Sequence, residues 1–284
     1  MRTIILFALG MLLNIYPKFN FGTWRIMGVL QRIALCYLFT SLIVLNFRQK
    51  GQITFIVILL LVYWALMTIV PYPGNGLDPW SWDNNFGRWF DKLIMGPFMW
   101  RPNEVELKSL AGTISATCTT LIGYQAGACL ISNRQPLDRT VRIFSAGTLL
   151  TVLGLFLVHW IPFSQNLWTP SFAIYTSGLG LLMLAFAYWW IDIREHRKGL
   201  APIIHFGSNA IIAWCASQLF SSTLNWIRVT HAGESMNLTM FIYENGLLPL
   251  MSKANASLVF GLCHVLLWWG VLAFMYRRKL FVKI

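Results

Sequence analysis

The chain has 284 residues, of which 57% are hydrophobic and only 11% are charged, and its mean hydropathy is +0.60. About a quarter of the residues are charged in ordinary soluble domains, so this composition excludes a soluble globular protein and predicts an all-α polytopic membrane protein. The net charge of +12 does not indicate a nucleic-acid partner, because the basic residues follow the loop pattern described below.

Eight transmembrane helices are expected within a single domain spanning residues 1–284. They are predicted at residues 3–16, 24–46, 52–70, 109–131, 139–161, 168–191, 203–224 and 254–276. The first segment is shorter than the ~20 residues that cross a bilayer. A signal peptide is disfavoured for it, because the basic region before it is short and no small-residue cleavage site follows.

The basic residues predict the orientation of the bundle. Alternate connections carry them, as in the segments 48–50, 134–142, 194–198 and 277–283, whereas Lys18 stands alone on the opposite side. Lysine and arginine concentrate in cytoplasmic loops, so both termini are expected to be cytoplasmic. Residues 71–108 and 225–253 then form long external loops, which either cap a site or only pack on the helix ends.

The cysteines do not indicate a disulfide framework or a metal site. All of them lie in apolar segments without a Cys-x-x-Cys pair, at Cys36, Cys118, Cys129, Cys215 and Cys263. Buried apolar thiols are the default for such positions, and no metal is expected.

The segment from Trp24 to Tyr37 brings charge into apolar surroundings. At 3.6 residues per turn, Arg25 and Arg32 are expected on one helix face, with Gln31 beside them. Arg25 can extend to the headgroups, but Arg32 lies about 10 Å further along the helix and is expected to line a polar interior. Gln31 and Asn209 are its expected partners, and its role is either functional or structural.

Other polar residues inside the predicted spans are candidate binding residues. His264 is expected near the bilayer midplane, where an ionisable group is either functional or a neutral imidazole bonded between helices. His205 and Asn209 are four residues apart, hence on one predicted face at the cytoplasmic mouth, with Ser208 between them.

A second candidate face lies near the external end of the predicted sixth span. Trp168, Ser171 and Tyr175 share this face if the helix begins at residue 168. A tryptophan at this depth is typical of the interfacial belt, although sugars also stack on such rings.

Several sequence blocks resemble one family. The run Trp24–Tyr37 closely resembles a block of the heparan-alpha-glucosaminide N-acetyltransferase family of transmembrane acyltransferases, which includes bacterial proteins linked to N-acetylglucosamine use. The run Asn-Leu-Trp-Thr-Pro-Ser-Phe at 166–172, continuing to Tyr-Trp-Trp-Ile-Asp at 188–192, resembles a second block. Residues 206–211 are similar to a third block, and residues 90–96 more weakly to a fourth.

The resemblance implies an integral protein of a bacterial inner membrane that takes an acetyl group from cytosolic acetyl-CoA. The acceptor would be an extracytoplasmic amino sugar of the glucosamine type. A polar interior also fits a permease for amino sugars or N-acetylglucosamine, although no inverted repeat is evident. The sequence leaves the oligomeric state open, a homo-oligomer included.

Two departures from the family pattern affect this expectation. Family members carry two further helices before the helix that starts here at Arg2, and the histidine proposed as catalytic lies in the loop between them. No residue here matches that histidine, so no catalytic residue is assigned and the chain is expected to be truncated and inactive or impaired. This departure is explained by a late start site, by a gene fragment or by a diverged member of the family. Of the three, the late start site explains it best. The run Lys108–Thr113 also differs from the family's block.

Overall fold

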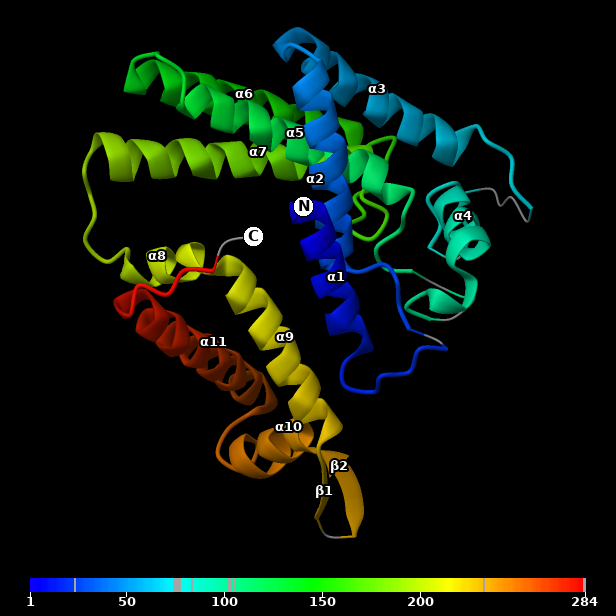
Figure 1. Ribbon diagram of the computed structural model, residues 1–284, viewed down its shortest axis with the longest axis vertical. Helices are drawn as coiled ribbons and strands as arrows, with labels where there is room; N and C mark the ends of the chain where they lie inside the picture. Colours follow the sequence, from blue (N-terminus) through cyan, green and yellow to red (C-terminus); the bar gives the residue numbers. More distant parts are fainter. Residues whose placement is uncertain are drawn as a thin grey trace. The chain divides into compact units, whose positions relative to one another are not determined.

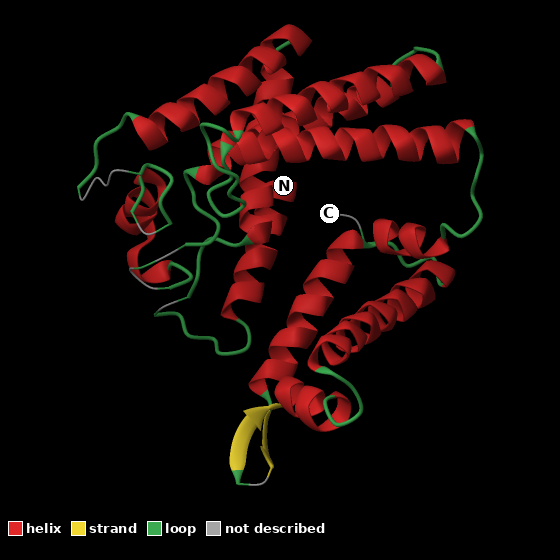
Figure 2. Cartoon of the chain, turned by 180° about the vertical axis from the view of Figure 1, so that it is seen from behind, coloured by secondary structure: helices red, strands yellow, loops and turns green. Residues whose placement is uncertain are grey.

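The computed structural model describes all residues except 23, 74–77, 83, 102, 103, 105, 232, 283 and 284. The described part is mostly helical, with one small β-hairpin (Figure 2). The chain forms two compact units. Unit 1 comprises residues 1–14 and 20–196, and unit 2 comprises residues 15–19 and 197–284.

Unit 1 contains most of the helices. They are α1 (Arg2–Ile15), α2 (Val29–Asn46), α3 (Gln49–Thr68), α4 (Phe86–Met95), the short 3₁₀ helix η1 (Gly96–Phe98), α5 (Gly112–Leu130), α6 (Pro136–Leu157), α7 (Pro170–Ala187) and the π-helical turn η2 (Tyr188–Ile193). Helix α5 packs against α2, α3, α6 and α7. Its buried residues are mostly small, among them Ser115, Ala116 and Thr117, and these allow close packing. Gly123 and Gly127 do not, since nothing lies within 4 Å of a Cβ atom added at either.

Helices α6 and α7 run side by side over most of their length (Figure 1). Glycines on both helices allow their backbones to approach. A Cβ atom on Gly178 would lie 2.5 Å from the backbone nitrogen of Thr151, and one on Gly154 would lie 2.7 Å from the backbone of Tyr175. Small residues at such crossings are the usual means of tight packing between membrane helices.

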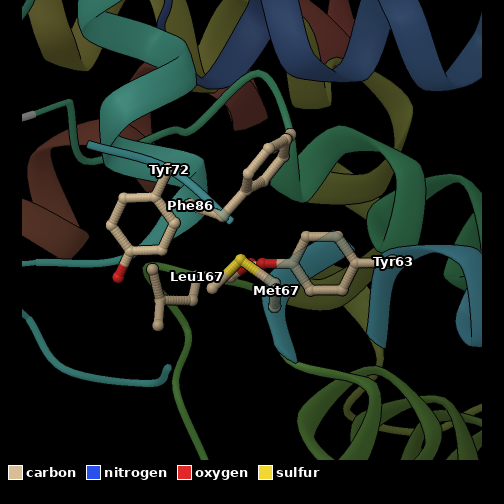
Figure 3. Close-up of a cluster of buried hydrophobic side chains, with 6 residues drawn as sticks. Tyr63, Met67, Tyr72, Phe86 and Leu167 are labelled. Atoms are coloured by element: carbon tan, nitrogen blue, oxygen red, sulfur yellow. The ribbon is translucent and has the colours of Figure 1, made fainter. Parts of the chain in front are cut away.

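A buried aromatic cluster joins α3, α4 and the loop before α7 (Figure 3). Tyr63 is 1% exposed, and its hydroxyl donates a hydrogen bond of 2.6 Å to the carbonyl oxygen of Leu167. Met67, Tyr72 and Phe86 fill the remaining space. A buried phenol normally needs such a partner, so the cluster fixes the loop as well as filling volume.

Unit 2 consists of α8 (Ala201–Ser208), α9 (Ala210–Trp226), β1 (Arg228–His231), β2 (Glu234–Asn237), α10 (Leu238–Phe241), the π-helical turn η3 (Ile242–Leu247) and α11 (Lys253–Arg277). The two strands are antiparallel, with Arg228 opposite Asn237, and Gly233 adopts a φ of +86° in the turn between them. No strand was predicted here from the sequence, because strands of only four residues leave no clear alternating pattern.

Five helices in the described residues are long and apolar enough to cross a membrane: α2, α3, α6, α7 together with η2, and α11. Helices α8 and α9 make a sixth span if they are counted together, but they are bent by 81°. Helix α1 has only 14 residues, and the 19-residue α5 is not among these five. The structure supports an all-α membrane protein, but it does not confirm the expected eight spans or the orientation of the termini.

The packing of α6 on α7 gives a first prediction. Replacing Gly178 with alanine places a methyl group where the backbone of α6 lies, so the helices must separate. Overpacking of this kind costs about 1–3 kcal/mol, and the melting temperature of the purified protein should fall. Gly180→Ala on the same helix is the control, because nothing lies within 4 Å of its added Cβ atom. Equal melting temperatures for the two variants would contradict this packing.

Candidate functional site

Arg32 lies in the first turn of α2 and is only 4% exposed. One guanidinium nitrogen, Nη2, donates a hydrogen bond of 3.0 Å to the carbonyl oxygen of Ser109. The other two, Nε and Nη1, are buried and have no hydrogen-bond partner in the described part of the chain. Burying a charged group costs several kcal/mol unless its donors are satisfied, so this guanidinium is a candidate ligand-binding group.

The ring of Trp168 provides the second contact of Arg32. The guanidinium carbon lies 5.2 Å from the ring centroid, within the range of a cation–π interaction. The indole nitrogen of Trp168 donates to Thr119 Oγ1 at 3.2 Å. Trp168 has a φ of +56°, a backbone conformation that is costly for a bulky side chain and that often marks a functional position.

Trp168 does not lie on α7 as the sequence analysis expected. The helix begins at Pro170, which follows an irregular loop over residues 161–169. The predicted face is therefore wrong for Trp168, whereas Ser171 and Tyr175 both lie on α7, four residues apart. Ser171 is fully buried and hydrogen-bonds Thr169 and the carbonyl of Pro162, so it holds the loop in place.

The start of α5 closes the site from the other side. A Cβ atom on Gly112 would lie 2.7 Å from the carbonyl oxygen of Leu167 and 3.4 Å from Nη2 of Arg32. Only a glycine lets these segments meet without displacement. The Leu167 carbonyl also accepts the hydrogen bond from Tyr63, so α3, α5 and the loop before α7 are fixed together around Arg32.

Asp91 of α4 supports the segment that holds Arg32. It is 1% exposed, and its Oδ1 accepts a hydrogen bond of 2.8 Å from the backbone nitrogen of Leu110. Burial raises the pKa of Asp91 to about 7, although hydrogen bonding from Ser109 and Leu110 and the nearby charge of Arg32 act in the opposite direction. Asp91 thus anchors the segment whose Ser109 carbonyl binds Arg32.

Arg25 forms a separate ion pair. Residues 24–28 are not helical, so the predicted face shared by Arg25 and Arg32 is wrong. The backbone nitrogen of Ile26 instead bonds the carbonyl of Phe98 at 2.9 Å. Arg25 Nε and Nη2 bind the carboxylate of Glu106, which also accepts hydrogen bonds from the backbone nitrogens of Trp100 and Lys108. This pair ties residues 24–28 to the loop before α5.

Gln31 and Asn209, the two partners expected for Arg32, have other contacts. Gln31 is 1% exposed and packs against Gly10, where an added Cβ atom would lie 2.5 Å from its Oε1. Its Nε2 has no hydrogen-bond partner in the described residues. Asn209 is also 1% exposed, and its amide bonds the backbone of Leu280 and Val282 at 3.0 Å each. It serves the fold of unit 2.

The remaining candidates also lie in unit 2. The chain leaves the helical path at Asn209, where α8 ends, so the predicted face of His205 and Asn209 is wrong. His205 Nδ1 accepts a hydrogen bond of 3.2 Å from the indole of Trp269, and Ser208 donates to the carbonyl of His205. His264 lies near Phe220 and Trp268 in a shallow, mainly apolar cavity of about 340 Å³.

A polar cavity of about 420 Å³ lies at the ends of α3, α5 and α6, within unit 1. Gln52 and Gln125 line it and are joined by a hydrogen bond of 2.6 Å. Arg134 and Arg142 also line it, and both lie close to the carboxylate of Asp138. The two arginines and one aspartate leave a net positive charge at this opening.

Four members of the site were not predicted from the sequence: Asp91, Glu106, Ser109 and Tyr63. One signal was present: the chain has only 10 acidic residues against 22 basic ones. Acids next to apolar helices are then the natural partners of buried arginines. Ser109 acts through its backbone carbonyl, which residue type cannot reveal.

The fold and this site define a helical membrane protein with a buried arginine centre. No model of a known protein family matches the chain. The chain is 21% identical to the heparan-alpha-glucosaminide N-acetyltransferase of Homo sapiens over 343 aligned residues, which cover 100% of this chain and 48% of the relative. The chain thus spans about half the length of that relative. The match supports a distant relationship between the two chains.

The raised pKa of Asp91 predicts that stability depends on pH. Unfolded aspartate has a pKa near 3.9, so the folded state binds the extra proton between about pH 4 and pH 7. Stability should therefore fall as pH rises through this window, by at most about 1.4 kcal/mol per pH unit, and level off above it. Asp91→Asn cannot titrate and should flatten the dependence, whereas Asp138→Asn on the surface should not. Melting temperatures of the three proteins from pH 5 to 8 provide the test, and parallel curves would refute it.

Proposed function

We propose that the chain is a membrane N-acetyltransferase that moves an acetyl group from cytosolic acetyl-CoA to an amino sugar on the other side of the membrane. The observation that carries the proposal is the buried Arg32 with two unpartnered nitrogens. It lies in the segment Trp24–Tyr37, whose sequence resembles the acyltransferase family. The distant match to an N-acetyltransferase supports the same activity.

The chemistry of the site fits acyl transfer. Attack of an amine on a thioester places negative charge on the carbonyl oxygen, and donors preorganised in a dry site stabilise that charge. The Nε and Nη1 atoms of Arg32 are such donors, and the guanidinium cannot lose its charge by titration. The ring of Trp168 holds the guanidinium in place. Because Arg32 is only 4% exposed, substrate access requires the Trp168 loop or α4 to move.

The polar cavity at the ends of α3, α5 and α6 fits the nucleotide end of acetyl-CoA. Arg134 and Arg142 supply guanidinium groups that can bind phosphate oxygens in pairs. Gln49, Gln52 and Gln125 add amide groups. The arginine-rich connection after α5 is one of those that the sequence assigns to the cytoplasm, the side on which acetyl-CoA is available.

One observation favours a carrier as the second candidate. Helices α8 and α9 form a pair bent by 81° at Asn209, and broken helices are a feature of substrate sites in transporters. The sequence contains no pair of broken helices at corresponding positions of two repeats. An inverted repeat requires two such breaks, and the bend at Asn209 in unit 2 supplies only one of them.

The central prediction concerns Arg32. Membranes containing the wild-type chain should transfer labelled acetyl from acetyl-CoA to glucosamine at a reduced rate, because no residue of the chain matches the histidine proposed as catalytic in the family. Arg32→Met should slow acetyl transfer by about 10²–10³-fold, because it removes the donors that stabilise the negative charge on the thioester oxygen. The melting temperature should hold or rise, because the variant removes a charge that is poorly paired. Arg32→Lys should transfer acetyl at a rate between those of the wild type and Arg32→Met. Lysine keeps the charge but lacks the planar set of donors of the guanidinium group.

The measurements are the rate of acetyl transfer, the binding of glucosamine and of acetyl-CoA by isothermal titration calorimetry, and the thermal unfolding of the three purified proteins. A well-folded Arg32→Met protein with unchanged binding and transfer would remove Arg32 from the site. Binding of glucosamine without any binding of acetyl-CoA by the wild type would reject the enzyme and leave a binding protein.

The carrier hypothesis makes a different prediction. Proteoliposomes containing the chain should take up labelled glucosamine or N-acetylglucosamine in the absence of acetyl-CoA, since a carrier moves substrate without chemistry. Uptake that strictly requires acetyl-CoA, or product that is always acetylated, would reject the carrier and support the acetyltransferase.

A further inference from the structure

A cavity of about 310 Å³ lies within unit 2, where the β-hairpin meets α10. Its walls come from the last turn of α9, the end of β2, α10, η3 and the start of α11. Two of the residues that line it, Asn225 and Ser257, are exposed, so the cavity opens to the surface. The loop charges predict that residues 225–253 are external, so a ligand would enter from that side.

Thr239 gives this cavity an unused hydrogen-bonding group. Its Oγ1 is buried and has no hydrogen-bond partner in the described part of the chain. A threonine within a helix can bond the carbonyl four residues earlier, as Thr223 does with Leu219 at 2.8 Å. Thr239 is the second residue of α10, and the residue four positions earlier lies in β2. A buried hydroxyl without a partner is costly, and a hydrogen bond to a ligand would recover that cost.

The other polar groups of the lining are uncharged amides and hydroxyls. The Oδ1 atom of Asn237 accepts a hydrogen bond of 2.7 Å from the backbone nitrogen of Met240, so its amide nitrogen is left as a donor. Asn225 adds a second amide, and Ser257 adds a hydroxyl. No charged residue is among the described residues that line the cavity. The lining therefore favours an uncharged ligand over a phosphate, a sulfate or an ammonium group.

Two aromatic rings supply most of the apolar part of the lining. Tyr243 and Phe260 meet edge to face, with their centroids 6.3 Å apart and their planes at 88°. Binding sites of this kind combine apolar walls with a few polar groups that orient the ligand. A saccharide ring has apolar C–H faces, which pack on aromatic rings, and a rim of hydroxyls, which bond amides and hydroxyls. An acyl chain would leave the polar groups of this cavity unpaired.

Backbone and side-chain hydrogen bonds hold the walls in position. The backbone nitrogen of Leu238 bonds the carbonyl of Ile227 at 2.9 Å, which joins the start of α10 to the residue after α9. The hydroxyl of Tyr243 donates a hydrogen bond of 3.1 Å to the carbonyl of Lys253, which joins η3 to α11. The polar groups are thus preorganised, which lowers the cost of binding a small ligand.

We propose that unit 2 binds one uncharged sugar residue in this cavity. Thr239, Asn225 and Asn237 bond its hydroxyl or acetamido groups, and the rings of Tyr243 and Phe260 pack against its C–H faces. The residues of this site all belong to unit 2, whereas Arg32 belongs to unit 1. The inference goes beyond the proposed acetyl transfer and does not depend on it.

The test is saturation-transfer difference NMR of methyl glucoside with the full chain in phosphatidylcholine nanodiscs, which contain no sugar headgroups. Methyl glucoside is uncharged and has no amine, so it is neither a substrate nor a product of acetyl transfer. The wild type should transfer saturation to the ring protons of the sugar. Thr239→Val and Asn225→Ala should each weaken binding about three- to tenfold, because each removes a hydrogen bond between uncharged groups.

Matched substitutions outside the cavity separate this effect from a loss of fold. Thr230→Val in β1 and Asn255→Ala in α11 make the same chemical changes at exposed positions that do not line the cavity, and both should bind like the wild type. Arg32→Met should also leave the binding of methyl glucoside unchanged. Absence of saturation transfer with the wild type would overturn the proposal. So would equal affinities of folded Thr239→Val and Thr230→Val proteins, or loss of binding in Arg32→Met alone.

Discussion

The guanidinium of Arg32 has to be held inside unit 1 without an ion pair to any described residue, and the surrounding structure is arranged to do this. One carbonyl and one aromatic face contact it, from Ser109 and Trp168. Each contact is fixed by a further one: Asp91 holds the residue after Ser109, and Thr119 holds the indole of Trp168. Gly112 allows the two segments to meet. Three helices and two loops thus surround one charged side chain. Two of its guanidinium nitrogens have no hydrogen-bond partner among the described residues.

Such an arrangement is costly for folding, and this cost is an argument for function. A folded protein that buries a cation with two unused donors is less stable than the same protein with an apolar side chain of similar volume at that position. The positive φ of Trp168 adds backbone strain beside the same charge. Both costs occur at one place, in the segment that resembles the acyltransferase family. By contrast, Asn209 and Ser171 are polar and buried but fully engaged, so they serve the fold.

The sequence predicted the elements that depend on local pattern. Long apolar runs located α2, α3, α6, α7 and α11, and the presence of Arg32 in such a run marked it as unusual. Helix starts were predicted less well. Residues 24–28 and 168–169 have helical composition, but Arg25 bonds Glu106, which is 81 positions away, and Trp168 lies over Arg32. These contacts between distant segments outweigh local propensity, which is only a weak determinant.

The partners of Arg32 were not predictable for the same reason. A carbonyl acceptor such as that of Ser109 leaves no trace in residue type, and a ring contact depends on a loop conformation. The membership of Asp91 follows from the packing of α4, a helix that was not predicted within the external loop 71–108. Two of the candidate residues named from the sequence, Arg32 and Trp168, lie in contact with each other. That they bind a ligand stays a prediction.

The most direct test of this account is an experimental structure of the membrane-reconstituted chain with acetyl-CoA and glucosamine bound. The account predicts ligand density within hydrogen-bond distance of Nε or Nη1 of Arg32, with the ring of Trp168 still against the guanidinium or displaced by the sugar. Both ligands bound elsewhere, with those two nitrogens paired to protein groups, would contradict it.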